Sequence, residues 1–179
     1  MPHLDAAYNL ARWLTRNEHD AQDMVQEAYL RALRFFGGFH GTDARAWLLT
    51  IVRNTCYTFL KRKQSPEFLC DFEEAVMTKE SDEPDPESSH ELKVQAQLIN
   101  EAIEKLPVEF REVVILRELE ELSYKEIAAI TGIPIGTVMS RLSRARKRLL
   151  AYLRGATRVD IRGTNVVQVP ASGNNRVAS

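Results

Sequence analysis

Residues 122–150, LSYKEIAAITGIPIGTVMSRLSRARKRLL, contain the pattern that decides the fold of this chain. Ser123, with Glu126 three residues later, forms a capping box, which predicts the start of a short helix. Gly132 can adopt the positive φ that ends such a helix, and Pro134 turns the chain into a long basic helix. A short helix, a glycine turn and a long basic helix are the layout of a helix-turn-helix.

The long basic helix of this motif is a candidate for DNA recognition. Small Ala128 leaves room for the second helix to cross the first, and Val138 can pack back onto it. Such a helix fits a major groove, where arginine can fork onto guanine and serine can contact a phosphate or a base edge. A helical hairpin with a solvated basic face is the alternative, but the lack of acids in residues 127–159 favours DNA binding. The expected contact residues are Thr137, Ser140, Arg141, Arg144, Arg146, Lys147 and Arg148.

Charge is segregated along the chain, although the formal net charge is only −1, from 24 Lys and Arg against 25 Asp and Glu. Residues 28–66 are basic, with Asp43 as their single acid. Residues 67–91 are acidic, with Lys79 as their single Lys or Arg. Such a sign asymmetry concerns partners and not fold. It predicts two basic modules, joined by an acidic segment, that contact one polyanion.

The helical periodicity predicts an all-α protein of two small helical domains joined by a flexible acidic linker, the C-terminal domain being a helix-turn-helix. Pro66, Pro84 and Pro86 interrupt the linker, which self-repulsion should extend. The negative charge of the linker is compatible with two roles. The linker could imitate nucleic acid in a basic channel, or it could be a solvated tether, and charge alone does not decide between them. The expected boundaries are residues 1–64 and 92–154 for the domains, 65–91 for the linker, and 155–179 for a disordered tail.

Three helices are predicted in the first domain. Apolar residues at positions 7, 10, 11 and 14 share one face of the first helix, which Asn17 should terminate. Asp20 is expected to cap the second helix. The third should extend from about Asp43 to Lys63, with Trp47 on its apolar inner face and therefore more suited to the core than to melting DNA.

Several classes of protein are excluded. No apolar run approaches the roughly 20 residues of a membrane helix, so we expect no membrane insertion. Cys56 and Cys70 are too few for a disulfide framework, and a cytoplasmic location fits them. The four histidines lack metal-ligand spacing, and no nucleophile–base pair or phosphate-binding loop is present. We therefore expect neither an enzyme nor a metal or other cofactor.

Residues 106–149, around the helix-turn-helix, resemble the C-terminal DNA-binding domain of bacterial extracytoplasmic-function (ECF) sigma factors, which belong to the sigma-70 type. DAQDMVQEAYLRALRFF, residues 20–36, and WLLTIVRNTCYTFLKRK, residues 47–63, resemble the N-terminal domain of the same family. The resemblance implies a sigma factor that binds core RNA polymerase, recognises and melts promoter DNA, and is commonly controlled by an anti-sigma factor. Its N-terminal domain would recognise the −10 element and its C-terminal domain the −35 element.

The resemblance also implies site residues in the first domain. A polar face of residues 20–36 would dock on core polymerase, unless it is simply solvated. The loop after these residues and the following helix would hold a flipped −10 base and its phosphates, although Asn54 could instead be an ordinary surface residue. The docking residues would be Asp23, Gln26, Glu27 and Arg31; the −10 residues would be Phe39, His40, Gly41, Thr42, Asp43, Arg53, Asn54, Lys61 and Arg62.

A stand-alone helix-turn-helix transcriptional regulator is the alternative function. Such a regulator needs a ligand pocket, a receiver domain or a dimer interface in the first domain, and the sequence suggests none of these. A pull-down with core polymerase separates the two functions.

Overall fold

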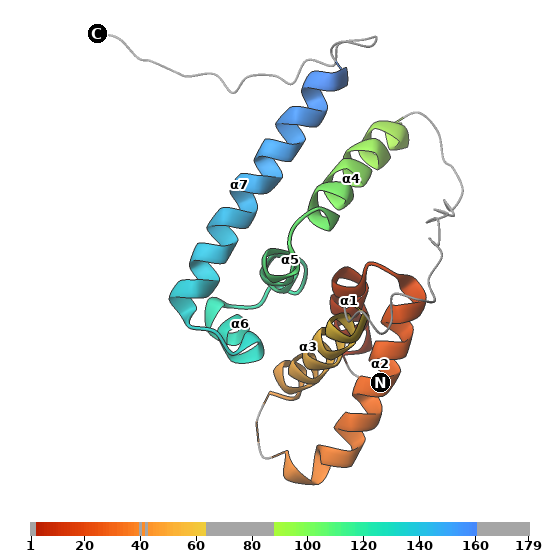
Figure 1. The fold of residues 1–179 in the computed structure, drawn as a ribbon, viewed down its shortest axis with the longest axis vertical. Coiled ribbons are helices and arrows are strands. Elements are labelled where there is room, and N and C mark those ends of the chain that lie inside the picture. The colour runs from red at the N-terminus through yellow and green to blue at the C-terminus, as the bar shows by residue number, and fades with distance from the viewer. Residues whose placement is uncertain (1–2, 40, 42, 64–87, 161–179) are drawn as a thin grey trace.

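The computed structural model describes residues 3–39, 41, 43–63 and 88–160, and in this part of the chain the regular structure is helical (Figure 1). The predicted site residues His40 and Thr42 lie outside it, as do Cys70, most of the predicted linker and residues 161–179. The helices are α1 (Leu4–Thr15), α2 (Glu18–Phe35), α3 (Ala44–Lys63), α4 (Ser88–Glu104), α5 (Val108–Val114), α6 (Tyr124–Thr131) and α7 (Ile135–Asp160).

Helices α1, α2 and α3 pack on one another as a three-helix bundle. The predicted start of α2 needs correction, because Asn17 caps the helix and Asp20 does not. The Asn17 Oδ1 accepts a hydrogen bond from the Asp20 backbone N at 3.0 Å, while Arg16 ends α1 in the left-handed region. Asp20 lies in the first turn, where its carboxylate pairs with Lys63 of α3 at 3.1 Å. The start of α3 is confirmed, since Asp43 accepts the Ala46 backbone N–H at 2.9 Å.

Helices α4 to α7 form the second part of the chain. The capping box of α6 is confirmed, with Ser123 and Glu126 each accepting the other's backbone N–H, and Gly132 ends the helix at φ 70°. Helix α4 begins at Ser88, so the last residues assigned to the linker are helical. Helix α7 ends at Asp160, so the first residues assigned to a disordered tail are helical as well.

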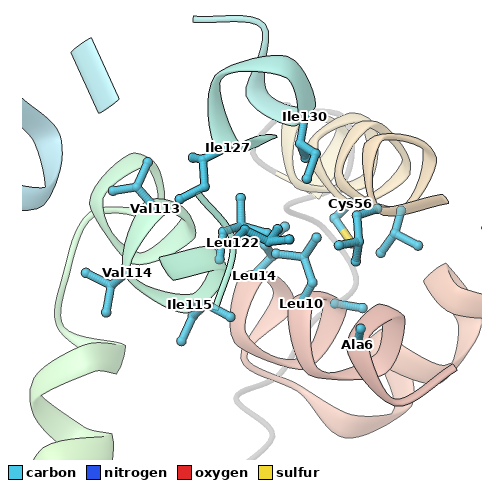
Figure 2. Close-up of a cluster of buried hydrophobic side chains, with 14 of the residues drawn as sticks. Ala6, Leu10, Leu14, Cys56, Val113, Val114, Ile115, Leu122, Ile127 and Ile130 are labelled. Carbon is cyan, nitrogen blue, oxygen red and sulfur yellow. The ribbon is translucent and has the colours of Figure 1, made fainter. Parts of the chain in front are cut away.

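The two predicted helical parts are confirmed, and they share one hydrophobic core, an arrangement that the sequence had left open. Leu10 and Leu14 of α1 and Cys56 of α3 belong to the same buried cluster as Ile127 and Ile130 of α6 (Figure 2). Helix α3 packs against α6, and α1 against α5. A shared core buries more apolar surface than two isolated small domains could, which stabilises each of them.

Candidate nucleic-acid interface

The helix-turn-helix is built by α6 and α7, which pack through Ile127 and Ile130 on one side and Val138 and Leu142 on the other. The backbone N–H groups of Thr137 and Val138 donate to the Pro134 carbonyl oxygen and fix the first turn of α7. Because its buried residues point inward, the opposite side of α7 is free to meet a ligand.

The structure divides the seven predicted −35 residues into three groups. Ser140, Arg144 and Lys147 are exposed and share the outer side of α7, while Thr137 and Arg141 are half-buried on its flank. Arg146 and Arg148 point elsewhere: Arg146 pairs with Glu118 at 2.7 Å, and the Arg148 guanidinium lies 4.7 Å from the ring centre of Phe110. The outer side of α7 therefore combines a hydroxyl group with two cationic side chains, a set that suits base edges and phosphates.

An aromatic cluster lies where α2 connects to α3. The Phe39 ring centre lies 4.7 Å from that of Trp47 and 6.5 Å from that of Phe36. The Phe39 ring also covers Gly41, where a Cβ would meet a ring carbon at 3.0 Å. Trp47 is half-buried against the core, in line with the sequence prediction. Phe39 and Trp47 form an aromatic surface of the kind on which an unstacked base can lie.

The remaining predicted −10 residues do not form a single site. Asn54, Lys61 and Arg62 are exposed on α3, whereas Asp43 is occupied as the cap of that helix. Arg53 is largely buried and points toward the second part of the chain. Asn54 is thus exposed with its Oδ1 accepting a hydrogen bond from the Arg53 Nη1 at 3.2 Å, while the Arg53 guanidinium itself is withdrawn from the exposed side of α3.

Arg53 is held by Glu112 of α5, a carboxylate with no exposed surface. Tyr57 donates its hydroxyl to the same carboxylate at 3.1 Å, and the Arg53 guanidinium lies 4.4 Å from the Tyr57 ring centre. Burial raises the pKa of Glu112, while Arg53, the Tyr57 hydroxyl and the more distant charge of Arg141 oppose that rise. The Arg53–Glu112–Tyr57 cluster is a buried polar connection between the two helical parts.

A second polar connection lies beside it. Arg45 of α3 pairs with the buried carboxylate of Glu120 at 2.6 Å, and the Asn9 amide donates to the same carboxylate at 3.2 Å. The first connection joins α3 to α5, and the second joins α1 and α3 to the segment between α5 and α6. Sequence reasoning missed them, because each pairs residues that are far apart in the chain.

The predicted docking residues lie on the outer side of α2. Asp23 and Gln26 are exposed, whereas Glu27 and Arg31 are half-buried and pair with each other at 2.8 Å. Leu30 and Leu33 are exposed in the turns that follow. Helical spacing places them near Gln26, and the prediction omitted them. Their signal in the sequence is that both leucines fall outside the buried stripe of α2.

Two further features limit the chemistry of the described residues. No helix among them is long and apolar enough to cross a membrane. They also contain no group of three or more His, Cys, Asp or Glu placed to hold a metal ion. The described thiol, Cys56, is buried, and burial raises its pKa to about 12, so it is a poor nucleophile.

The described residues form a three-helix bundle joined to a helix-turn-helix whose second helix is exposed and cationic. This architecture defines the class of the protein as a two-part helix-turn-helix protein. Residues 1–65 match Sigma-70 region 2, and residues 96–149 match Sigma-70, region 4. The ECF RNA polymerase sigma-E factor of Escherichia coli K12 is 39% identical over 140 residues, which cover 73% of this chain and 72% of that protein. The chain therefore belongs to the ECF sigma factors of the sigma-70 family.

Other relatives agree with this assignment. The ECF RNA polymerase sigma factor SigE of Mycolicibacterium smegmatis is 36% identical over 154 residues, which cover 84% of this chain but only 58% of that protein. A solved structure of the sigma factor RpoE in complex with the anti-sigma factor NepR, from Bartonella quintana, has a TM-score of 0.65 and 30% identity, covering 84% of this chain and 91% of that one. The solved structure of CnrH in complex with the cytosolic domain of CnrY has a TM-score of 0.61 and 25% identity, and the match covers 86% of this chain and 83% of that one.

Proposed function

We propose that this chain is a sigma subunit that binds core RNA polymerase and directs promoter recognition, DNA melting and transcription initiation. The observation that carries the proposal is the combination, in one chain, of a helix-turn-helix with an exposed cationic side and a helical domain that matches Sigma-70 region 2. A helix-turn-helix alone would serve any DNA-binding regulator, whereas the second match is particular to sigma factors.

Each surface then has a role. The outer side of α2, with Asp23, Gln26, Leu30 and Leu33, docks on core polymerase. The aromatic cluster and Asn54 receive a flipped base of the −10 element, because an aromatic wall and an amide suit a base and its Watson–Crick edge. The outer side of α7 enters the major groove of the −35 element. None of these roles involves catalysis by the chain itself.

We also propose control by an anti-sigma factor in the cytoplasm. The support is the Bartonella quintana relative, which was solved with an anti-sigma factor and matches most of this chain. An anti-sigma factor would bind the compact arrangement described above, in which Arg53 is buried against Glu112.

Run-off transcription with the purified chain, core polymerase and genomic DNA fragments tests the proposed function. We expect defined start sites that appear only when the chain is added, and binding of the chain to core polymerase in a pull-down. If the chain bound promoter fragments specifically without core polymerase and did not bind core polymerase, it would be a stand-alone helix-turn-helix regulator.

Arg144→Ala is expected to weaken promoter binding by about 1–3 kcal/mol, because an exposed arginine in a major groove can form a bidentate contact with a base. Arg146→Ala is the matched control, since the Arg146 side chain is already paired with Glu118 on the same helix-turn-helix. Binding of both variants to a start-site-mapped promoter, with core polymerase at fixed salt, is the measurement. Equal losses in the two variants would contradict the assignment of Arg144.

Asn54→Ala is expected to reduce discrimination at one position of the −10 element by about 1 kcal/mol, the value of a typical hydrogen bond. Binding to core polymerase should not change, because Asn54 lies on α3 and the proposed docking surface lies on α2. Initiation from promoters varied at each −10 position is the measurement, with Thr58→Ala, an exposed neighbour one turn later, as the control. An unchanged base preference would remove Asn54 from the site.

A further inference from the structure

A cavity of about 590 Å³ lies between the two helical parts. Its walls come from α1 and α3 of the first part, and from α5 and the turn before it in the second. A volume of this size is typical of sites that hold a small molecule. Among the described residues that line the cavity no side chain is acidic, and four are cationic: Arg16, Lys61, Lys63 and Arg111.

Arg111 is the buried member of this cationic group, with 5% of its surface exposed. Its Nη1 donates to the Glu104 carbonyl oxygen at 2.9 Å, which ties α5 to the end of α4. Its Nε is also buried and has no hydrogen-bond partner among the described residues. Burial and the nearby charge of Arg16 lower the pKa of Arg111 to about 10, while Glu104 opposes that change. A buried donor without a partner is costly, so an anion that accepts from Arg111 would recover that cost.

The other three cationic residues are exposed, at the open side of the cavity. The Arg16 Nη1 donates to the same Glu104 carbonyl oxygen at 3.3 Å, so the Arg16 and Arg111 guanidinium groups meet at one oxygen atom. Lys63 is already paired with Asp20. Arg16, Lys61 and Arg111 form no ion pair with a carboxylate in the described part of the chain. Three positive charges therefore surround the cavity without a negative charge to balance them.

The charge and the walls of the cavity together restrict the class of ligand. A single carboxylate would balance only one of the three charges, whereas a diphosphate group carries several, and guanidinium groups match phosphate oxygens in a bidentate fork. The walls also include the apolar side chains of Leu14, Leu60 and Leu106. Inorganic phosphate would leave these leucines uncovered, and an organic body attached to the phosphates would cover them.

We propose that this cavity binds a small organic diphosphate, with its phosphate groups on Arg16, Lys61 and Arg111 and its organic body against the leucines. Because both helical parts contribute walls, the ligand binds the packed arrangement and stabilises it against separation. Lys61 was also predicted to contact the −10 element, so a bound ligand competes with that contact. The site itself does not depend on the proposed function.

Isothermal titration calorimetry of the full chain with ADP, pyrophosphate and inorganic phosphate, in phosphate-free buffer at fixed salt, tests the proposal. We expect ADP to bind to one site per chain and pyrophosphate to bind more weakly, because pyrophosphate has no organic body. Inorganic phosphate should bind most weakly of the three. The midpoint of urea unfolding should rise with the concentration of ADP, since the ligand binds the folded chain.

Two variants locate the site. Arg111→Lys is expected to weaken ADP binding by about tenfold, because lysine keeps the charge and loses the fork. Lys61→Gln should weaken it by about three- to fivefold, as expected for an exposed charge. Since Lys61 is exposed on α3, its variant keeps the test valid if the Arg111 variant does not fold. Arg62→Gln is the matched control, because Arg62 is the next residue on α3, is also exposed and does not line the cavity.

Three results would overturn the proposal. ADP does not bind, or it binds no more tightly than inorganic phosphate, or Arg62→Gln weakens ADP binding as much as Lys61→Gln does. The last result would indicate general attraction to the basic end of α3 and no defined site. None of these measurements uses core polymerase or promoter DNA, so their outcome is separate from that of the proposed function.

Discussion

Glu112→Ala should lower the free energy of unfolding by about 3 kcal/mol, because removing one partner of a buried ion pair leaves the other charge without compensation. The Glu112 carboxylate has no exposed surface and is bound by both Arg53 and Tyr57. Its removal also leaves a cavity where the buried side chain was. Urea unfolding of the full chain, followed by circular dichroism, is the measurement.

Glu118→Ala is the control for this prediction. Glu118 pairs with Arg146, but both side chains are about half exposed, and exposed ion pairs contribute at most about 1 kcal/mol. The two glutamates lie on neighbouring turns of the same segment, so the comparison separates burial from pairing. Equal losses of stability would show that the interface around Arg53 does not contribute as the contacts suggest.

Ile127→Ala is expected to lower the free energy of unfolding by about 3 kcal/mol, within the range for removing a fully buried isoleucine side chain and leaving a cavity. Ile127 lies on α6, where the helix-turn-helix meets the shared core (Figure 2). The loss should therefore extend to promoter binding, since a poorly packed α6 cannot hold α7 in place.

The control is Ile135→Ala, which removes the same atoms from a side chain that is partly exposed at the start of α7. We expect its effect on stability to stay within about 0.5 kcal/mol, as for most surface substitutions. Thermal and urea unfolding of the two variants are the measurements. A similar loss in both would mean that Ile127 is not part of a rigid core.

The parts of the fold that depend on neighbouring residues could be predicted from the sequence. The capping box at Ser123, the positive φ of Gly132 and the apolar stripe of α1 each depend on residues within a turn or two of one another. The cap of α2 shows the limit of this reasoning. Asn17 and Asp20 both have side chains suited to capping, and the end of α1 at Arg16 decides between them.

The predicted site was less accessible to sequence reasoning because its residues depend on distant partners. From its own helix alone Arg53 is predicted to contact DNA, and the structure pairs it with Glu112, which is 59 residues away. Glu112 lies in a mainly apolar stretch, where no local pattern indicates a partner. Leu30 and Leu33 were missed although both fall outside the buried stripe of α2, because single exposed leucines are common on protein surfaces and carry no functional signal by themselves.

Some partners could bind only after the two helical parts separate. The shared core and its two buried polar connections lower the affinity of such a partner. The apparent dissociation constant of such a partner is the intrinsic constant divided by the fraction of molecules already open. Each 1.4 kcal/mol that favours the closed arrangement therefore weakens the apparent affinity by about tenfold. Substitutions at Glu112 or Glu120 would act in the opposite direction, so a variant that is less stable can be the stronger binder.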